Sequence, residues 1–477
     1  MTALVVFLII ILGSLVVTFY ARAHRQSNTL SEFFVANRSF VSFLFFFLAV
    51  GEIYSIGTLV GFPGGIYAGG ATYAVWFMGY ILLAYPIGFF INPLIWRIAK
   101  RYKSETGPDF FQSHWNSKGL GLLMSVSGLI FIIPWGQLQF AGLEEVLHAF
   151  KFYLSPSLAL TIAGALCLAY ILVSGMRAVA MVAVVKDVFM VAAIVIIGVA
   201  ALSAAHGSQP IFSHLVTSSK TAVAVPAPET LFVLSTIVVQ AMGFYASPFG
   251  MQYVFTAKSS RAVAKAQIFM PLYMLMYVFL VVAAFFAALH IPGLAKNPDF
   301  AIFAVSEHLL PGWVQGIIAA GAALSGLMVL TGLSLTVSAI VSKNVVRQWI
   351  NPRATDVQVR RWAEMVVAGY LLLDLLLTVI APHLMLNLIN TAYYGFTQFF
   401  PAILAALFWR RATAVGVGTG LVVGDLVALT LYFLHVSPGG LNLGLIALVA
   451  NFIVMIGMSL ITPRRHGSTS GEPLKIG

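Results

Sequence analysis

The chain has 477 residues, of which 60% are hydrophobic and only 9% are charged. A soluble domain carries about 25% charged residues, so this composition excludes an ordinary soluble protein and indicates a membrane protein. Apolar runs of about 20 residues, the length that crosses a bilayer as a helix, recur along the whole chain. The single cysteine, Cys167, allows no internal disulfide.

Thirteen membrane-spanning helices are predicted, which makes the chain an all-α membrane protein. The first apolar run lacks the basic start and the small-residue cleavage site of a signal peptide, so we interpret it as a retained helix. The predicted spans lie near residues 3–21, 42–66, 71–96, 119–147, 155–173, 179–203, 230–255, 266–290, 313–341, 362–381, 385–408, 413–435 and 441–462.

The basic residues predict how these spans are oriented. If the N-terminus lies outside, all 26 Lys and Arg except Lys151, Lys186, Lys220 and Lys296 fall in cytoplasmic segments. Cytoplasmic loops of membrane proteins carry this excess. We therefore expect a multi-pass protein of a bacterial plasma membrane with a cytoplasmic C-terminus. The net charge of +11 is spread over many loops, so the expected partners are the lipid bilayer and a small solute, with no nucleic acid. No obligatory protein partner is evident.

Two predicted spans carry clusters of Gly and Pro at matching places. GEIYSIGTLVGFPGG (51–65) lies in the second span and QAMGFYASPFGMQY (240–253) in the seventh. Matched interruptions predict two repeats of five spans, each starting with a broken helix that leaves backbone groups free to bind an ion or solute. Gly and Pro also kink membrane helices or let them pack closely, which is the alternative.

Four motifs, in this order, resemble those of the sodium:solute symporter family, and the resemblance covers nearly the whole chain. They are SEFFVANRSF (31–40), SIGTLVGFPGGIY (55–67), SGMRAV (174–179) and FTQFFPAILAALFWRRATAVGVGTGLVVG (396–424). The resemblance implies a leucine-transporter-like fold of two inverted five-helix repeats, over 42–205 and 206–409. An extra N-terminal helix lies in 1–41 and two C-terminal helices in 410–477.

The resemblance also implies a sodium site, from which this sequence departs. The family's carbonyl ligands correspond to Gly51 and Tyr54. Backbone oxygens are present whatever the side chain, so this part of the site can be kept. Its pair of hydroxyl ligands falls on Met328 and Val329, and its carboxylate falls on Ala183. None of these three side chains has an oxygen.

Side chains near this site leave several interpretations open. Ser325 or Thr331 would supply the missing hydroxyl ligands if the register of the ninth span is offset. Lys186, one turn beyond the carboxylate position, places a cation where sodium would bind. Two unit charges about 4 Å apart interact by roughly 4 kcal/mol at an effective dielectric of about 20. We interpret Lys186 as a tethered replacement for the ion whose protonation drives transport. The alternative is a lysine that snorkels to the interface from about 12 Å deep.

Other acidic residues also lie within predicted spans. Glu52 is predicted to pair with Lys186 or to carry a proton, the alternative being a carboxylate bonded to helix-end amides. Asp187, about 100° around the helix from Lys186, is expected to face another helix instead. Asp374 and Asp425 are predicted to be structural. Histidines show no ligand spacing, so no metal site and no cofactor are expected apart from a transported proton or sodium ion.

The solute site is predicted between the two broken helices. Aromatic and polar residues in these spans are also common packing residues, and no Arg lies within a span to clamp a carboxylate. The candidate solute-binding residues are Tyr54, Ser55, Thr58, Gln240, Tyr245, Ser247, Gln252, Tyr393, Tyr394 and Gln398.

The family resemblance implies a secondary active transporter that imports a small organic solute by alternating access. An amino acid, a short carboxylate or a neutral polar solute fits the polar candidates. The departures from the sodium site favour sodium-independent or proton-coupled transport through Lys186 and Glu52. Sodium-coupled symport is the alternative. A membrane solute sensor, which would need a separate signalling partner, is the alternative of a different class. No nucleophile elbow, phosphate loop or metal motif predicts an enzyme.

Overall fold

The computed structural model describes residues 2–23, 29–150, 161–162, 164–168, 175–218, 223–381 and 383–463. These residues are nearly all helical, and the described part contains no strand, only one isolated backbone bridge. Nine described helices are long and apolar enough to cross a membrane, or ten if one bent pair counts as a single span. The predicted span at 155–173 lies mostly outside the described residues.

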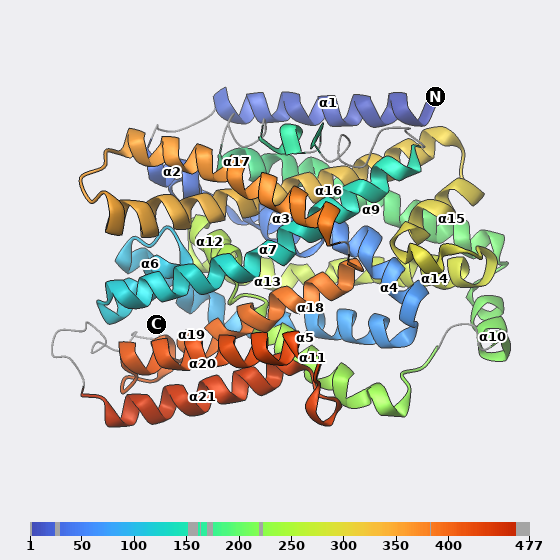
Figure 1. Cartoon of the computed structure of the whole chain (residues 1–477). Helices are drawn as coiled ribbons and strands as arrows, with labels where there is room; N and C mark the ends of the chain where they lie inside the picture. The colour runs from blue at the N-terminus through green and yellow to red at the C-terminus, as the bar shows by residue number, and fades with distance from the viewer. Residues whose placement is uncertain are drawn as a thin grey trace.

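The helices lie side by side in one elongated bundle (Figure 1). Short helices α2 (Leu30–Val35) and α6 (Gly107–Trp115) lie at one end, and α10 (Ser208–Ser218) and α15 (Ala301–Leu309) lie at the other. We call the end with α2 and α6 the inner end, following the orientation predicted from the basic loops. The opposite end is the outer end.

The predicted first repeat contains two half-helices followed by long membrane helices. Helix α1 (Thr2–Ala23) precedes it and packs along one edge of the bundle against α9 and α16 (Figure 1). The other helices are α3 (Ser42–Ile53), η2 (Gly57–Gly61), α4 (Phe62–Gly69), α5 (Ala71–Tyr102), α7 (Lys118–Ala149) and α9 (Met176–Ala204).

The predicted second repeat has the same plan, and two helices at the opposite edge follow it. The exact limits of both repeats stay a prediction. The helices are α11 (Thr230–Gly243), α12 (Pro248–Thr256), α13 (Ser260–Phe269), η4 (Met270–Met274), α14 (Leu275–His290), η6 (Pro298–Phe300), α16 (Gly312–Ala339), η7 (Ile340–Ile350), α17 (Asp356–Ile380), α18 (Met385–Phe396), η8 (Thr397–Phe399), α19 (Phe400–Phe408), α20 (Ala414–Phe433) and α21 (Leu443–Ile461).

Both predicted helix breaks are confirmed. Helix α3 stops at Tyr54, whose φ of −95° and ψ of 70° are not helical, and the chain resumes its helix at Gly57. Helices α11 and α12 are bent by 44° across a break after Gly243. Pro248 is the first residue of α12. A helix tolerates proline in its first turn, because the backbone N–H that proline lacks would have no helical partner there.

A backbone bridge ties the two broken helices together at the inner end. Phe40 N donates to Thr256 O (3.1 Å), and Lys258 N donates to Phe40 O (2.8 Å). Phe40 precedes α3, whereas Thr256 ends α12. The bridge therefore joins the start of one broken helix to the end of the other, so their inner halves are held as one unit.

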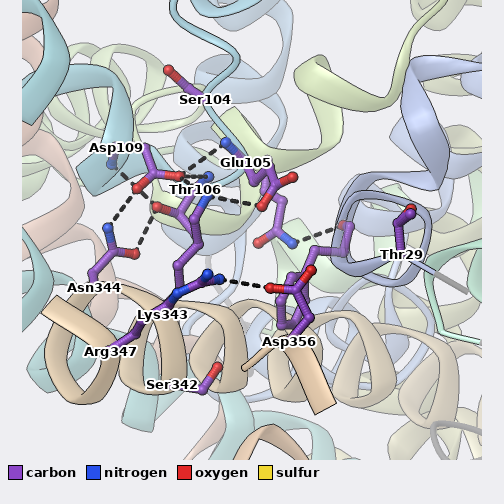
Figure 2. Close-up of polar contacts among 12 residues, drawn as sticks. Thr29, Ser104, Glu105, Thr106, Asp109, Ser342, Lys343, Asn344, Arg347 and Asp356 are labelled. Carbon is purple, nitrogen blue, oxygen red and sulfur yellow. Dashed lines mark hydrogen bonds and ion pairs between the residues drawn. The ribbon is translucent and has the colours of Figure 1, made fainter. Parts of the chain in front are cut away.

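The inner end is also closed by a buried polar cluster between α6 and η7 (Figure 2). Lys343 Nζ lies 2.8 Å from both Glu105 Oε2 and Asp109 Oδ2, and Asn344 Nδ2 donates to Asp109 Oδ1 (2.6 Å). Asp109 also caps α6 with Thr106. Burial raises the pKa of Asp109, but the Lys343 ammonium and the hydrogen bonds outweigh burial and lower that pKa overall.

We predict that Asp109→Asn destabilises the protein by about 2 kcal/mol, because it removes one of the two carboxylates that pair with the Lys343 ammonium and weakens hydrogen bonds to a charged group. Thermal unfolding in detergent would measure the change. Asp356→Asn is the matched control, since Asp356 is 61% exposed where it meets Arg347, and exposed pairs contribute about 1 kcal/mol or less. Equal melting temperatures for the two variants would contradict the prediction.

Candidate functional site

Lys186 lies at the break of the first broken helix. Its side chain is fully buried on α9, and its Nζ donates to Gly51 O (3.2 Å) and Tyr54 O (2.9 Å). The carbonyls in the last turn of α3 have no amide partner further along the helix, and they form the negative end of its dipole. Lys186 thus contacts the two backbone oxygens that the family resemblance assigns to sodium, and its role as a replacement for the ion stays a prediction.

The third acceptor of Lys186 corrects one prediction. Asp187 was expected to face away from Lys186, but its Oδ1 lies 2.5 Å from Lys186 Nζ, and both side chains are buried. Neighbouring positions point about 100° apart, yet the long lysine side chain folds back to the carboxylate. Tyr273 OH donates to the other oxygen of Asp187 (3.4 Å). The three N–H donors of the ammonium thus have three acceptors.

Glu52 lies in α3, but its side chain is outside the described part of the structure. The predicted contact between Glu52 and Lys186 therefore stays a prediction.

The positions that the family resemblance assigns to sodium ligands come together in space. Gly51, Ala183, Met328 and Val329 line one gap of only about 10 Å³, together with Leu48, Val179 and Tyr253. This volume is close to the roughly 10–15 Å³ that a cavity needs to hold one water molecule. The gap is lined mainly by apolar side chains, and the Lys186 ammonium lies beside it, 3.5 Å from where a Cβ on Gly51 would stand.

The two alternative hydroxyl ligands lie elsewhere on α16. Ser325 Oγ donates to Gly321 O (2.7 Å), and Thr331 Oγ1 donates to Leu327 O (2.6 Å). Neither residue is among those that line the gap. The ungapped register, with Met328 and Val329 at the hydroxyl positions, is therefore the one this geometry favours.

A second cavity, of about 40 Å³, lies between the two broken helices and is walled by aromatic rings. The Trp135 ring stacks on Phe249 (centroids 5.8 Å apart) and meets Tyr393 edge to face (5.6 Å). Tyr80 and Phe244 continue this wall. None of the described lining residues is charged. We call this space the central cavity.

Three polar groups of the central cavity differ in their hydrogen bonding. Asn92 is fully buried, and neither its oxygen nor its nitrogen has a hydrogen-bond partner among the described residues. The indole N–H of Trp135 is likewise unpaired in this part of the chain. Tyr245 OH, by contrast, donates to Gln267 Oε1 (2.5 Å). Buried polar groups without partners are rare in native proteins, so Asn92 and Trp135 indicate a missing polar ligand or water.

Only two of the predicted solute-binding residues, Tyr245 and Tyr393, line the central cavity. The other side chains make contacts within or between helices. Tyr54 OH bonds to Tyr85 OH, Ser55 Oγ to the Gly57 amide, Thr58 Oγ1 to Tyr277 OH, Gln240 to Asn390, Ser247 Oγ to the Gly250 amide, Gln252 to Phe34 O and Gln398 to Tyr394 O, while the Tyr394 ring contacts Tyr432.

Sequence reasoning missed several residues of the central cavity: Phe45, Ala49, Tyr80, Asn92, Trp135, Phe244, Phe249, Gly250, Tyr253, Val254 and Gln267. Most are aromatic or apolar residues in helices that are apolar all around, where no local pattern marks the face that meets the cavity. Asn92 offered a signal, because it is a polar residue well inside a predicted span.

A third cavity, of about 600 Å³, lies at the outer end between α7 and the segment before α15. We call it the outer vestibule. Glu144, Glu145, Asp299 and His148 line it, and Asn297 Nδ2 donates to Glu145 Oε2 (3.0 Å). It is the most acidic of the three cavities.

Asp299 closes the outer end of the first broken helix. Its Oδ2 accepts a hydrogen bond from the amide of Met385 at the start of α18 (3.0 Å). Its other oxygen lies so close to Gly64 of α4 that a Cβ there would overlap it. Burial raises the pKa of Asp299 to about 7, and the nearby charge of Glu145 adds to this, although the Met385 amide lowers it.

These features define a helical membrane protein with two broken helices around a buried cation and a small central cavity, the plan of a secondary transporter. The family model for the sodium:solute symporter family matches residues 33–424. The chain belongs to the sodium:solute symporter family. It is a multi-pass membrane transporter of a small solute, and its fold is that of a transporter, as predicted.

Similar proteins span the whole chain. An uncharacterized symporter, YhjB, from Bacillus subtilis (strain 168) is 28% identical, with 98% of this chain and 99% of the relative covered. A monocarboxylate transport permease protein of Rhizobium johnstonii is 26% identical over 97% and 98%. The solved structure of a Na+-coupled sialic acid symporter in a substrate-bound outward-open state superposes with a TM-score of 0.80 at 14% identity, covering 98% and 99%. This last likeness establishes the fold alone.

We predict that the stability of the wild type falls by about 1 kcal/mol as the pH rises from about 6 to about 8. Asp299 holds its proton in the folded state up to about pH 7, whereas the unfolded carboxyl is already ionised. The folded state therefore binds more protons in this range and loses stability as the pH rises through 7. Melting temperatures in detergent would measure it. Asp299→Asn should make the dependence weaker by about this amount, and the exposed control Asp356→Asn should keep it.

Proposed function

We propose that this chain imports a small organic solute, an amino acid or a short carboxylate, across a bacterial plasma membrane without a bound sodium ion. The N-terminus lies outside and the C-terminus inside in this proposal. The observation that carries it is the contact of Lys186 Nζ with the carbonyl oxygens of Gly51 and Tyr54. A tethered ammonium lies beside the place where the resemblance puts sodium, and it bonds to two backbone oxygens that the resemblance assigns as sodium ligands.

The chemistry around this ammonium supports sodium independence. Sodium needs several oxygen ligands at short distance, and Ala183, Met328 and Val329 provide none from their side chains. A sodium ion would also meet the charge of Lys186 at close range. Asp187 and the two carbonyls use all three N–H donors of Lys186, which favours a fixed cation over a proton carrier. Proton coupling through Lys186 and Glu52 remains an untested prediction.

The central cavity supports the solute class. Trp135 and Asn92 offer unpaired N–H donors inside an uncharged aromatic wall. Such donors suit the carboxylate of a small acid or amino acid, and the aromatic rings suit its carbon chain. The relative that is named a monocarboxylate transport permease supports the same class. Sodium-coupled symport and solute sensing without transport are the outcomes that the experiments below would detect.

We predict that Lys186→Ala lowers sodium-free uptake at least about tenfold, because it removes the counter-charge of the buried Asp187 and the donor to two helix-end carbonyls. Uptake of radiolabelled L-alanine, L-proline, L-lactate and pyruvate into proteoliposomes, in sodium or in choline, would measure it. Lys118→Ala, at an exposed lysine, is the control. Wild-type uptake that requires sodium and survives Lys186→Ala would contradict the proposal.

We predict that Asn92→Leu raises the KM for the transported solute about tenfold, since one hydrogen bond to a charged group contributes about 1.5–3 kcal/mol. Concentration series in the same proteoliposomes would give KM and the maximal rate. Asn387→Leu, an exposed asparagine on α18, should leave both unchanged. An unchanged KM in Asn92→Leu would remove Asn92 from the solute site.

A further inference from the structure

A second buried acid lies away from Lys186, on α17. Asp374 is fully buried, and its carboxyl meets the phenol of Tyr370 but no cationic side chain among the described residues. It takes part in no ion pair within the described chain. An ionised carboxylate in this position would lose its hydration without a counter-charge, which costs several kcal/mol. The surroundings of Asp374 therefore suit the neutral, protonated acid.

Gly136 of α7 makes the space that the Asp374 carboxyl occupies. A Cβ at position 136 would overlap both the carboxyl and the hydroxyl of Tyr370, which comes from the preceding turn of α17. Tyr370 OH in turn donates to Ile132 O (3.3 Å). The carboxyl thus sits in a notch of a neighbouring helix, with a phenol beside it.

The titratable groups facing this notch carry no positive charge. Within α17 the neighbour is Tyr370, and the thiol of Cys167 lies near enough to interact electrostatically with Asp374. Helix α17 also packs against α7, α16 and η7. Helix α16 has no charged residue, and α7 presents Gly136 at the carboxyl. The acidic side chains of α7, Glu144 and Glu145, face the outer vestibule.

The notch lies just beneath the floor of the outer vestibule. Thr378 and Gln137 line the vestibule, and each lies within about one turn of Asp374 or Gly136 along its helix. Thr378 Oγ1 donates to the backbone oxygen of Asp374 (2.8 Å). On the other side of Gly136, Trp135 lines the central cavity. Asp374, in the notch at Gly136, therefore lies between the outer vestibule on one side and the central cavity on the other.

We propose that Asp374 is the site that binds the driving proton, one proton being taken up from the outer vestibule and released inside with each solute. This inference rests on the proposed sodium-independent transport, in which Lys186 is a fixed cation. The neutral acid packs in the notch of Gly136, whereas the ionised carboxylate is drawn toward water. Loss of the proton therefore displaces α17 relative to α7, next to the central cavity.

Asp374→Asn tests the proposal, because asparagine imitates the neutral acid and cannot release a proton. Purified protein in sodium-free proteoliposomes would be given L-alanine, L-proline, L-lactate or pyruvate. An internal pH dye reports proton entry, and protein-free vesicles correct for passive entry of weak acids. We expect Asp374→Asn to lose proton entry and to lower accumulation driven by a pH gradient at least about tenfold. Exchange of external for internal solute at equal pH should stay within about twofold of wild type.

Asp425→Asn is the matched control, since Asp425 is another intramembrane aspartate, on α20 outside the predicted repeats. It should leave all three activities unchanged. Proton entry that persists in Asp374→Asn would overturn the proposal. Loss of exchange in a variant with the wild-type melting temperature would also overturn it, since a neutral mimic must still exchange solute.

Two further outcomes separate this inference from the proposed function. Wild-type solute exchange in choline without any proton entry would overturn the role of Asp374 and leave the role of Lys186 intact. A sodium requirement of the wild type would instead remove the proposed function. If Asp374→Asn does not fold, infrared difference spectra of the wild type with labelled aspartate would test whether Asp374 changes its protonation. Solute should change the band of a protonated carboxyl, and an unchanged band would overturn the proposal.

Discussion

The need to satisfy backbone groups inside a membrane governs this structure. Where α3 breaks at Tyr54, carbonyl oxygens lose their helical partners in a region without bulk water, and an exposed carbonyl there is expensive. Lys186 meets this need from a neighbouring helix, and Asp187 balances its charge. The contact joins α9 to the broken helix. If either helix moves, the other must therefore move with it, or the contact must break. In sodium-coupled relatives the resemblance assigns the same task to an ion that can leave, whereas a lysine cannot.

That difference shapes how the rest of the molecule works. In the proposed function, a tethered cation fixes the charge beside the helix break throughout the transport cycle, so the driving energy would enter elsewhere. The neutral central cavity holds no counter-ion of its own, and its unpaired donors suit an anion or a zwitterion. A buried acid such as Asp374, between an acidic vestibule and this cavity, balances an incoming anion with a proton. Two of the intramembrane aspartates thus have different surroundings and different tasks in our proposal: Asp187 pairs with a cation, whereas Asp374 does not.

The two ends of the bundle are closed by different chemistry. At the inner end, Lys343, Glu105 and Asp109 form a buried network of opposite charges (Figure 2). At the outer end, one carboxyl, Asp299, bridges α4 and the start of α18 without a cation. An ion-pair network of this kind holds its charges over a wide pH range, whereas a lone buried acid responds near neutrality. The outer end is therefore the pH-sensitive one, and it is the end with the large acidic cavity.

Local sequence determined the helices and their breaks. Long apolar runs specify membrane helices, and the Gly and Pro clusters at 51–65 and 240–253 specify where two of them are interrupted, because both effects depend on neighbouring residues alone. The family motifs added the register, which correctly brought Gly51, Ala183, Met328 and Val329 together and placed Lys186 near the carbonyls of the break.

Only the tertiary structure decided which side chains meet. Helical position placed Asp187 away from Lys186, but a long side chain crosses the angle between adjacent residues, so the two pair. Gln240, Ser247, Gln252 and Gln398 looked like solute ligands, yet they bond to neighbouring helices or their own turns. Trp135, Asn92 and Phe249 were not among the predicted solute ligands, yet they line the central cavity. In helices that are apolar on every side, sequence specifies the helix but not its facing partner, since that choice depends on how all the helices pack together.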